Sequence, residues 1–446
     1  MSTQQVSMLF VAMAAISLLA FAAGVLARRL RQPPVIGEVL LGVLLGPTLL
    51  DGAVSDVLFP EEIRPFLAVL ANIGVALFMF AVGAELDAGL IRGRRLVAGT
   101  VATGSMVLPF LLGALLALYL FENHPTGDRT GFVLFMGAAM SVTAFPVLAR
   151  ILTDRGMQRT WLGAVALACA AIDDVLAWTL LAVVVAMSGA AGGSEWLLLL
   201  FVPYVVLMFT LVRPALRRLL EHRWCAGAGN PAAIVLTLTG LLLSAAFTEW
   251  IGLHFIFGAF VFGAVMPRRT TRGEPSDVTG RVRERISSLN DVLLLPLFFI
   301  VAGLKVDLSG MDGTGLLELG LILAVAVGGK FVGAFAAARA TGMQNRPATA
   351  LAVLINTRGL TELVILTVGL QLGALDDELY SVMVVMALVT TAMAGPLLHL
   401  LYPARPASPP AAPAVPPAGR KGAGKETFLA GPALDNVNSG NASAME

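Results

Sequence analysis

The stretch "ALFMFAVGAELD" at residues 76–87 returns 220 residues later as "PLFFIVAGLKVD" at residues 296–307. The two copies share leucine, phenylalanine, glycine and aspartate at matching positions, and most other positions are apolar in both. Two further pairs fall on the same offset, Ile36/Ile256 and Pro47/Pro267. Because the offset recurs in a second helix, chance similarity between two apolar segments is a weaker explanation than an internal duplication.

The composition indicates an integral membrane protein. Of its 446 residues 57% are hydrophobic and only 13% are charged, and the mean hydropathy is +0.84. The net charge of +1 is spread along the chain, so no nucleic-acid surface is expected. The two cysteines, Cys169 and Cys225, indicate neither a disulfide framework nor a metal site, and we expect no cofactor and no enzymatic activity.

Thirteen apolar runs are long enough to cross a hydrocarbon layer of roughly 30 Å. They span residues 6–27, 35–50, 64–86, 96–120, 131–152, 161–187, 195–219, 231–249, 252–267, 286–305, 315–339, 347–372 and 378–401. The loops between them alternate between basic and acidic, so the positive-inside rule predicts an external N-terminus and a cytoplasmic C-terminus, in a bacterial-type plasma membrane. The repeated segments lie an odd number of spans apart and so cross in opposite senses. Inverted repeats of this kind are typical of alternating-access transporters.

Two regions are expected along the chain. Residues 1–402 form the membrane domain, and residues 403–446, rich in proline and alanine, are expected to be a disordered cytoplasmic tail because they offer little surface to bury.

Two adjacent acids interrupt an apolar segment. The stretch "ACAAIDDVLAWTL" at residues 168–180 places Asp173 and Asp174 at the centre of the predicted helix 161–187. Each ionisable group at that depth costs about 2.5 to 3.5 kcal/mol, so it normally faces a partner or a wet cavity. Adjacent side chains point about 100° apart, so one acid can bind a cation while the other forms an ion pair. Burial favours the protonated acid and a nearby cation favours the carboxylate, so such a site exchanges a proton for a metal ion. The alternative is a pair that only locks helix ends.

Lys330 is the one lysine deep within an apolar run, out of four in the chain. Unlike arginine, lysine can lose its proton when it is desolvated. Lys330 is therefore predicted to pair with Asp173 and to release it when an ion arrives. A static tether between helices is the simpler alternative.

Two apolar runs carry helix-breaking or polar residues near mid-membrane, and they are seven spans apart. "SVTAFPVLAR" (141–150) and "INTRGLTELVIL" (355–366) hold Thr143, Pro146, Asn356, Thr357, Arg358 and Gly359. Backbone breaks at that depth are tolerated where protein or a water-filled cavity satisfies them, and a pair of broken helices indicates a transporter's binding site. A simple proline kink is the alternative for the first. Arg358 and Glu362, four residues apart, are interpreted as a structural ion pair.

Several motifs together resemble the monovalent cation:proton antiporter-2 family of sodium/hydrogen exchangers, in order from about residue 34 to 372. They are "VIGEVLLGVLLGPTLL", "LFMFAVGAELD", "TAFPVLARIL", "AIDDVLAW", "IFGAFVFGAVMP", "LPLFFIVAGLKVD", "GKFVGAFAAAR" and "NTRGLTELVIL". The resemblance implies an all-α fold with crossed discontinuous helices, and a homodimer in which a core bundle moves against a dimerisation bundle.

The resemblance also assigns roles to residues. Asp174 matches the carboxylate that binds cation and proton, Asp173 the variable residue before it, and Lys330 the partner lysine. Thr143, expected as a further ligand of the monovalent cation, and the segment 356–359 match the unwound helices beside the site. Asp173 with Lys330 favours electrogenic exchange. Many potassium-efflux relatives carry a nucleotide-binding domain after the last helix; the short tail argues against nucleotide regulation here.

The sequence thus predicts a secondary transporter that exchanges Na⁺ or K⁺ for H⁺ across the plasma membrane by alternating access. Three alternatives remain open at this point: a cation channel, a non-transporting sensor on an antiporter fold, and an organic-anion transporter of the same architecture. Broken helices within an inverted repeat argue against the channel, and an acidic site suits cations better than anions.

Overall fold

The computed structural model consists of helices and loops, and no β-strand occurs in the residues that it describes. These residues are 2–30, 32–48, 52–85, 95–126, 128–157, 160–187, 200–222, 231–267 and 277–401. The chain divides into two units, Met1–Ala404 and Arg405–Glu446. The second unit, with most of the predicted tail, lies outside the described residues, as do Asp87 and Cys225.

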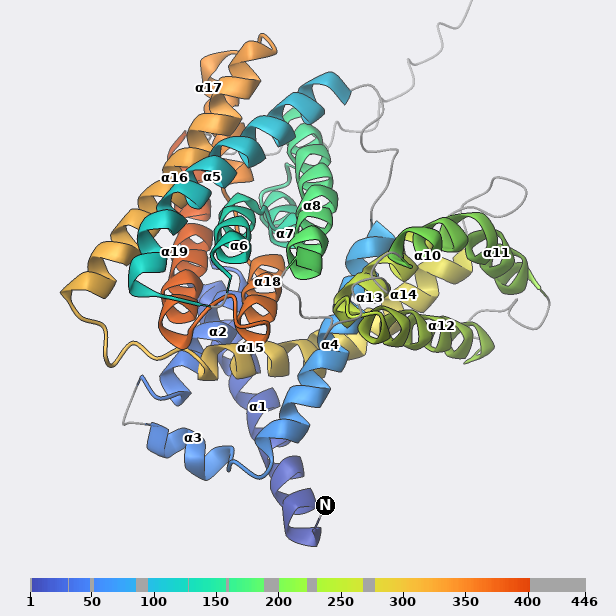
Figure 1. Ribbon diagram of the computed structural model, residues 1–446. Coiled ribbons are helices and arrows are strands. Elements are labelled where there is room, and N and C mark those ends of the chain that lie inside the picture. The colour runs from blue at the N-terminus through green and yellow to red at the C-terminus, as the bar shows by residue number, and fades with distance from the viewer. Residues whose placement is uncertain are drawn as a thin grey trace, which may run out of the picture. The chain divides into compact units, whose positions relative to one another are not determined.

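The helices follow one another along the chain (Figure 1). Their bounds are α1 Thr3–Arg29, α2 Pro34–Leu45, α3 Ala53–Leu58, α4 Arg64–Glu85, α5 Arg95–Asn123, α6 Arg129–Ser141, α7 Phe145–Asp154, α8 Trp161–Met187, α10 Phe201–Leu207, η2 Met208–Val212, α11 Arg213–Glu221, α12 Pro231–Trp250, α13 Phe255–Val265, α14 Asp277–Leu289, η3 Asn290–Leu294, α15 Leu295–Leu304, α16 Gly313–Ala340, α17 Asn345–Ile355, α18 Leu360–Gln371 and α19 Asp377–Leu401. The segments η2 and η3 are single π-helical turns inside longer helices.

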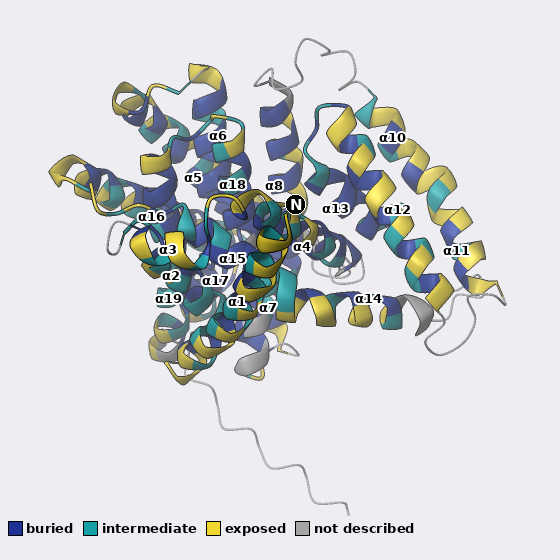
Figure 2. Ribbon diagram, turned by 90° about the horizontal axis from the view of Figure 1, so that it is seen from below, coloured by how far each residue is buried: buried dark blue, intermediate teal, exposed yellow. Residues whose placement is uncertain are grey.

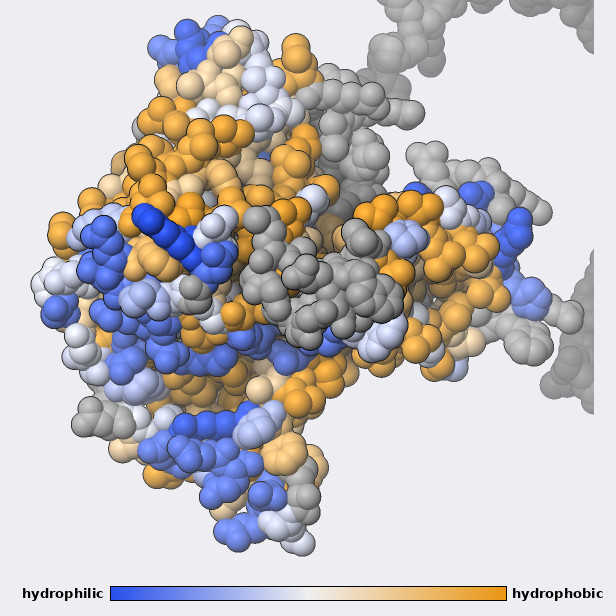
Figure 3. Space-filling model, in the orientation of Figure 1, coloured by the Kyte–Doolittle hydropathy of each residue, from blue (hydrophilic) through white to orange (hydrophobic). Residues whose placement is uncertain are grey.

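Nine helical stretches among the described residues are long and apolar enough to cross a membrane, where α6 with α7 and α14 with α15 each count as one stretch, and three shorter apolar helices accompany them. Each of the thirteen predicted runs contains a helix, although residues 195–199 of the seventh lie outside the described part of the chain. Large apolar side chains such as Leu111, Leu115 and Val332 lie exposed on α5 and α16, where Figure 3 shows broad hydrophobic surface. Such a surface suits lipid as the solvent. The protein is therefore a multi-pass membrane protein.

The internal repeat is visible as two equivalent helix crossings. The repeated glycines are Gly83 of α4 and Gly303 of α15. Each lies where a helix of the other repeat crosses in direct backbone contact. A Cβ at Gly83 would lie 2.1 Å from the carbonyl oxygen of Phe260 in α13, and one at Gly303 would lie 2.5 Å from that of Val39 in α2. Only glycine allows so close an approach. Each repeat thus packs against its counterpart.

Two predicted spans are broken into half-helices, as the sequence predicted. Between α6 and α7 residues 142–144 leave the helix, and between α17 and α18 residues 356–359 do the same. Around them α5 packs on α6, α8 and α16, while α16 also contacts α17 and α19. Figure 2 shows mainly buried residues along α6 and α18, whereas α11 and α12 carry exposed faces. The breaks therefore lie in the protein interior.

A buried histidine joins three of the helices that surround the breaks. His124, directly after α5, places Nδ1 2.7 Å from Asp376 Oδ2 and Nε2 2.9 Å from Glu318 Oε2 of α16. Asn123 Nδ2 donates to the other Glu318 oxygen at 2.7 Å. Because both ring nitrogens face carboxylates, both carry protons. The bond to Asp376 is the main cause that raises the pKa of His124 to about 9, with burial opposing it and Glu318 assisting.

This network predicts a loss of stability in alkali. A raised histidine pKa contributes stability that is complete below the unfolded value of 6.5 and is lost as the pH rises through about 9. We expect about 2 kcal/mol, reduced by solvent screening because the Asp376 side chain is partly exposed. The apparent melting temperature of wild type should fall between pH 7 and 10 by several degrees more than that of His124→Gln. The exposed His222→Gln should follow wild type. Parallel curves for wild type and His124→Gln would contradict the assignment.

Candidate functional site

The two central acids project from one continuous helix into the protein interior. Helix α8 runs unbroken from Trp161 to Met187, and Asp173 and Asp174 lie at its middle, each with 0% of its surface exposed. Consecutive positions on a helix point about 100° apart, so the two carboxylates face different neighbours. Both are closed off from solvent in this conformation.

Asp173 is held by hydroxyl groups from two other elements. Thr143 Oγ1, in the break after α6, donates to Asp173 Oδ2 at 2.6 Å, and Ser105 Oγ of α5 lies 3.4 Å from the same oxygen. The second oxygen, Oδ1, is buried without a hydrogen-bond partner among the described residues. Thr143 and Ser105 thus place two hydroxyl groups beside the same carboxylate oxygen of Asp173.

The two broken helices form hydrogen bonds with each other where they cross. Ala144 N donates to Thr357 O at 3.1 Å, and Thr143 Oγ1 also reaches Ile355 O at 3.2 Å. Gly359 has a φ of 156°, and a Cβ there would lie 2.6 Å from Val147 Cγ2. Since unwound backbone inside a membrane must find partners in protein or water, the crossing explains how both breaks persist.

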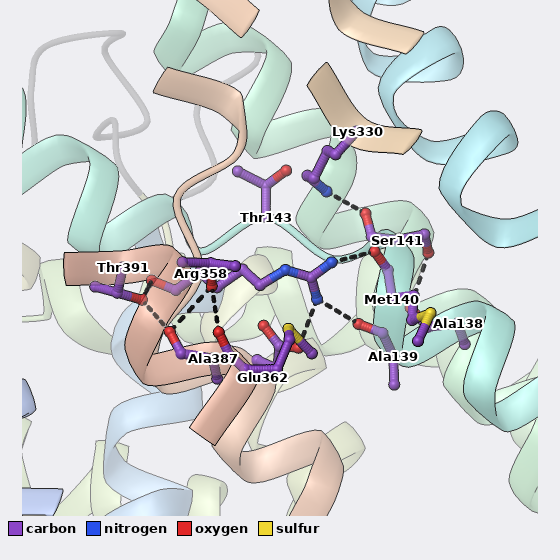
Figure 4. A network of polar contacts seen from close by, with 12 residues as sticks. Ala138, Ala139, Met140, Ser141, Thr143, Lys330, Arg358, Glu362, Ala387 and Thr391 are labelled. Atoms are coloured by element: carbon purple, nitrogen blue, oxygen red, sulfur yellow. Dashed lines mark hydrogen bonds and ion pairs between the residues drawn. The ribbon is translucent and has the colours of Figure 1, made fainter. Parts of the chain in front are cut away.

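Two cations cap the end of α6. The Lys330 ammonium donates to Ser141 O, while the Arg358 guanidinium donates to Ala139 O at 2.9 Å and to Met140 O (Figure 4). The last carbonyls of a helix carry partial negative charge and lack intrahelical donors, so they attract cations. Lys330 and Arg358 thus stabilise a half-helix that ends inside the membrane.

Lys330 also lies within the field of the acids. Its side chain is fully buried, and Asp173, Asp174 and Glu362 attract it while Arg358 repels it. The hydrogen bond that the structure gives its ammonium nevertheless goes to Ser141 O. The pairing of Lys330 with Asp173 therefore stays a prediction.

Arg358 and Glu362 form a buried ion pair across the start of α18. Arg358 Nη1 lies 2.5 Å from Glu362 Oε1, and both side chains have 0% of their surface exposed. Thr391 of α19 donates to Arg358 O at 2.8 Å. With its two bonds to α6, Arg358 fastens the second break to the first, which agrees with a structural reading of the pair.

Most of the residues singled out from the sequence meet at this crossing. Pro146 occupies the first turn of α7, where a missing N–H costs nothing, so it begins the half-helix instead of kinking a longer one. Asn356 Oδ1 and Thr357 Oγ1 are buried oxygens without a hydrogen-bond partner among the described residues. Asp173 Oδ1 is a third buried oxygen of this kind.

Sequence reasoning missed two features of the site. Ser105 is a lone serine in the apolar stretch "ATGSMVLP" (102–109), and only the packing of α5 brings it to Asp173. The carbonyl of Ser141 as an acceptor for Lys330 has no signal in the residue types, because every residue has a carbonyl.

Comparisons with known proteins identify the family. The family model described as "Sodium/hydrogen exchanger, transmembrane" matches residues 15–402. The Na⁺/H⁺ antiporter NhaS4 of Synechocystis sp. is 38% identical over 390 residues, covering 85% of this chain and 94% of that protein. The chain therefore belongs to the sodium/hydrogen exchanger family, which makes it a cation:proton antiporter and not an enzyme.

Two eukaryotic relatives are longer. Cation/H⁺ antiporter 20 of Arabidopsis thaliana is 39% identical over 408 residues, 85% of this chain and 47% of that protein. K⁺/H⁺ antiporter 1 of Saccharomyces cerevisiae is 35% identical over 389 residues, 84% of this chain and 44% of that protein. The chain thus spans about half the length of these two relatives.

A solved structure confirms the predicted fold. The sodium proton antiporter MjNhaP1 from Methanocaldococcus jannaschii superposes with a TM-score of 0.62 at 14% sequence identity, over 90% of this chain and 98% of that one. At that identity the likeness concerns the fold alone.

The buried ion pair yields a stability prediction. Replacing Arg358 by glutamine removes the partner of buried Glu362 and the donors to Ala139 and Met140, which should cost about 3 to 5 kcal/mol. The apparent melting temperature in detergent should fall strongly, and Arg358→Leu/Glu362→Leu should lose less than the sum of the two single changes. The exposed pair Arg64–Asp56 supplies a control, because Arg64→Gln should cost below about 1 kcal/mol. Equal losses for Arg358→Gln and Arg64→Gln would refute the structural role.

Proposed function

We propose that this protein exchanges Na⁺ or K⁺ for H⁺ across the plasma membrane, with Asp174 binding cation and proton in turn. The observation that carries the proposal is a pair of fully buried adjacent carboxylates beside two crossed broken helices. A buried acid without water favours its protonated form, and a bound cation favours its charged form, so the two ligands compete for one group.

The residues around the two acids indicate a different role for each acid. Asp173 is engaged by Thr143 and lies in the field of Lys330, which suits a counter-charge. Asp174, one position along α8, is directed elsewhere and is the acid that takes the cation, with Thr143 as a further oxygen ligand. When the cation arrives, its charge replaces that of Lys330 beside Asp173. Competition between ion, proton and lysine is sufficient for coupled exchange.

The names of the relatives support both candidate ions. One is called a Na⁺/H⁺ antiporter and another a K⁺/H⁺ antiporter, so sodium and potassium are the substrates to be tested. The alternating basic loops support an external N-terminus and a cytoplasmic C-terminus. The family resemblance of the motifs supports a homodimer and a membrane domain at residues 1–402 followed by a cytoplasmic tail.

The proposal predicts the behaviour of the two aspartates in proteoliposomes. With a pH-sensitive dye inside, Na⁺ or K⁺ added to wild type should dissipate an imposed proton gradient, and Asp174→Asn should lower that rate at least about tenfold, because an amide cannot exchange a proton for a cation. The exposed Asp56→Asn should match wild type. A wild type that is silent with Na⁺, K⁺ and Li⁺, or an Asp174→Asn variant that exchanges normally, would contradict the proposal.

A further inference from the structure

The helices pack as two groups. Helices α5, α6, α7, α8, α16, α17, α18 and α19 pack on one another and carry the central acids, Lys330 and both breaks; we call them the site group. Helices α1, α2, α4, α12, α13, α14 and α15 pack on one another and form the flanking group. Helices α2 and α19 are in contact and join the two groups. A motion of one group against the other must therefore change the contacts of α19.

A proline gives α19 a carbonyl that lacks a donor within its own helix. Pro396 lies inside α19 and has no N–H, so the carbonyl of Ala392, four residues earlier, loses its usual intrahelical partner. Gln32, between α1 and α2, supplies a donor, because its Nε2 lies 3.2 Å from Ala392 O. The two residues are 360 positions apart in the sequence. This hydrogen bond thus ties the flanking group to the site group.

The other end of α19 is tied to the flanking group by a similar bond. Tyr380, in the first turn of α19, is fully buried and donates its hydroxyl to Ala302 O near the end of α15 at 3.0 Å. The last carbonyls of a helix lack intrahelical donors, so they accept side-chain donors of this kind. Ser381 Oγ also accepts from Asp307 N, just after α15, at 3.0 Å. Helix α19 is therefore fastened at both ends.

Both ties can be exchanged for water without unwinding a helix. Ala392 O and Ala302 O are backbone acceptors that are bound by side chains of the other group. When the groups separate at one end, water can take the place of the side chain at the freed carbonyl. A hydrogen bond that water can replace contributes little net free energy, so such a tie opens and closes readily.

The seam behind Gln32 is closed in this conformation. A cavity of about 10 Å³ lies between α2, α18 and α19, is lined among others by Val35 and Leu388, and reaches Gly359 in the second break. A cavity of that volume holds about one water molecule at most. The central acids are themselves fully buried. The structure is thus closed at the contact between α2 and α19 as well as around the acids.

We propose that Gln32 and Tyr380 are positioning residues for exchange: each holds one end of α19 against the flanking group and so keeps its own face of the membrane domain closed. The inference rests on the proposed function and its orientation, in which α19 runs from the external to the cytoplasmic face. Gln32 is then the cytoplasmic tie and Tyr380 the external tie. The apparent affinity for a cation is proportional to the fraction of protein that is open to it, so loss of a tie raises that affinity at its own face.

The test is the apparent KM for Na⁺ and for K⁺ at each face, measured with a pH-sensitive dye in everted and in right-side-out membrane vesicles. Gln32→Leu should lower the apparent KM about 3-fold to 10-fold in everted vesicles, whose cytoplasmic face meets the added cation, because one hydrogen bond is lost. Its value in right-side-out vesicles should stay at that of wild type. Tyr380→Phe, which removes only a hydroxyl, should give the reverse pattern.

Pro396→Ala tests the cytoplasmic tie from its other side. The new N–H can bond to Ala392 O within α19, so a second donor competes with Gln32. The apparent KM in everted vesicles should then fall as it does in Gln32→Leu, by a smaller factor. Because alanine stabilises the interior of a helix relative to proline, a folding defect would not produce this result.

Two matched controls make the same chemical changes elsewhere. Gln344→Leu alters a glutamine on the same predicted face whose side chain caps no helix, and Tyr119→Phe alters an exposed tyrosine of α5; both should leave the values unmoved. A Gln32→Leu shift that is absent or equal at both faces would overturn the inference. So would a Tyr380→Phe effect at the cytoplasmic face, or an unchanged value in Pro396→Ala. Silence of wild type with both cations would instead refute the proposed function, so the two failures are distinguished.

Discussion

The structure depends on one constraint: backbone that leaves a helix inside a membrane must still find hydrogen-bond partners. An unsatisfied peptide group in hydrocarbon costs several kcal/mol, so a single broken helix would be unstable there. This protein breaks two helices at the same place and lets each satisfy the other, through Ala144 N to Thr357 O and through the Thr143 side chain to Ile355 O. The crossing therefore brings polar backbone atoms close to the central acids. Non-helical backbone is stable at this depth because other protein groups form hydrogen bonds with it.

The buried charges follow from that crossing. The end of α6 presents three successive carbonyls, of Ala139, Met140 and Ser141, and Arg358 and Lys330 bind them. Arg358, in the second break, is in turn neutralised by Glu362 in the first turn of α18. Lys330 is attracted by Asp173 but donates to Ser141 O in this conformation. Both cations thus bind the end of α6, and the proposed function gives Lys330 a further role in exchange.

Much of this was predictable because the signals are local in the sequence. Hydropathy marks the spans, the offset of 220 residues marks the repeat, and Pro146 and Gly359 mark the breaks. The paired acids and Lys330 stand out because charge is rare in apolar segments. Ser105, the Ser141 carbonyl and the His124 network were not predictable, since each depends on which helices meet. The role of a serine in an apolar run or of a histidine at a helix end depends on a contact with a residue some 70 to 250 positions away in the sequence.

The central claim is that a cation and a proton compete for Asp174, and the most direct measurement is proton release on cation binding to the purified protein. Saturating amounts of Na⁺ or K⁺ would be added to detergent-solubilised wild type and to Asp174→Asn in weakly buffered solution near neutral pH, with a pH indicator. The account predicts release of protons from wild type and none from Asp174→Asn, because a bound cation must displace the proton from that carboxylate. Cation binding to wild type without proton release, or equal release from Asp174→Asn, would contradict it.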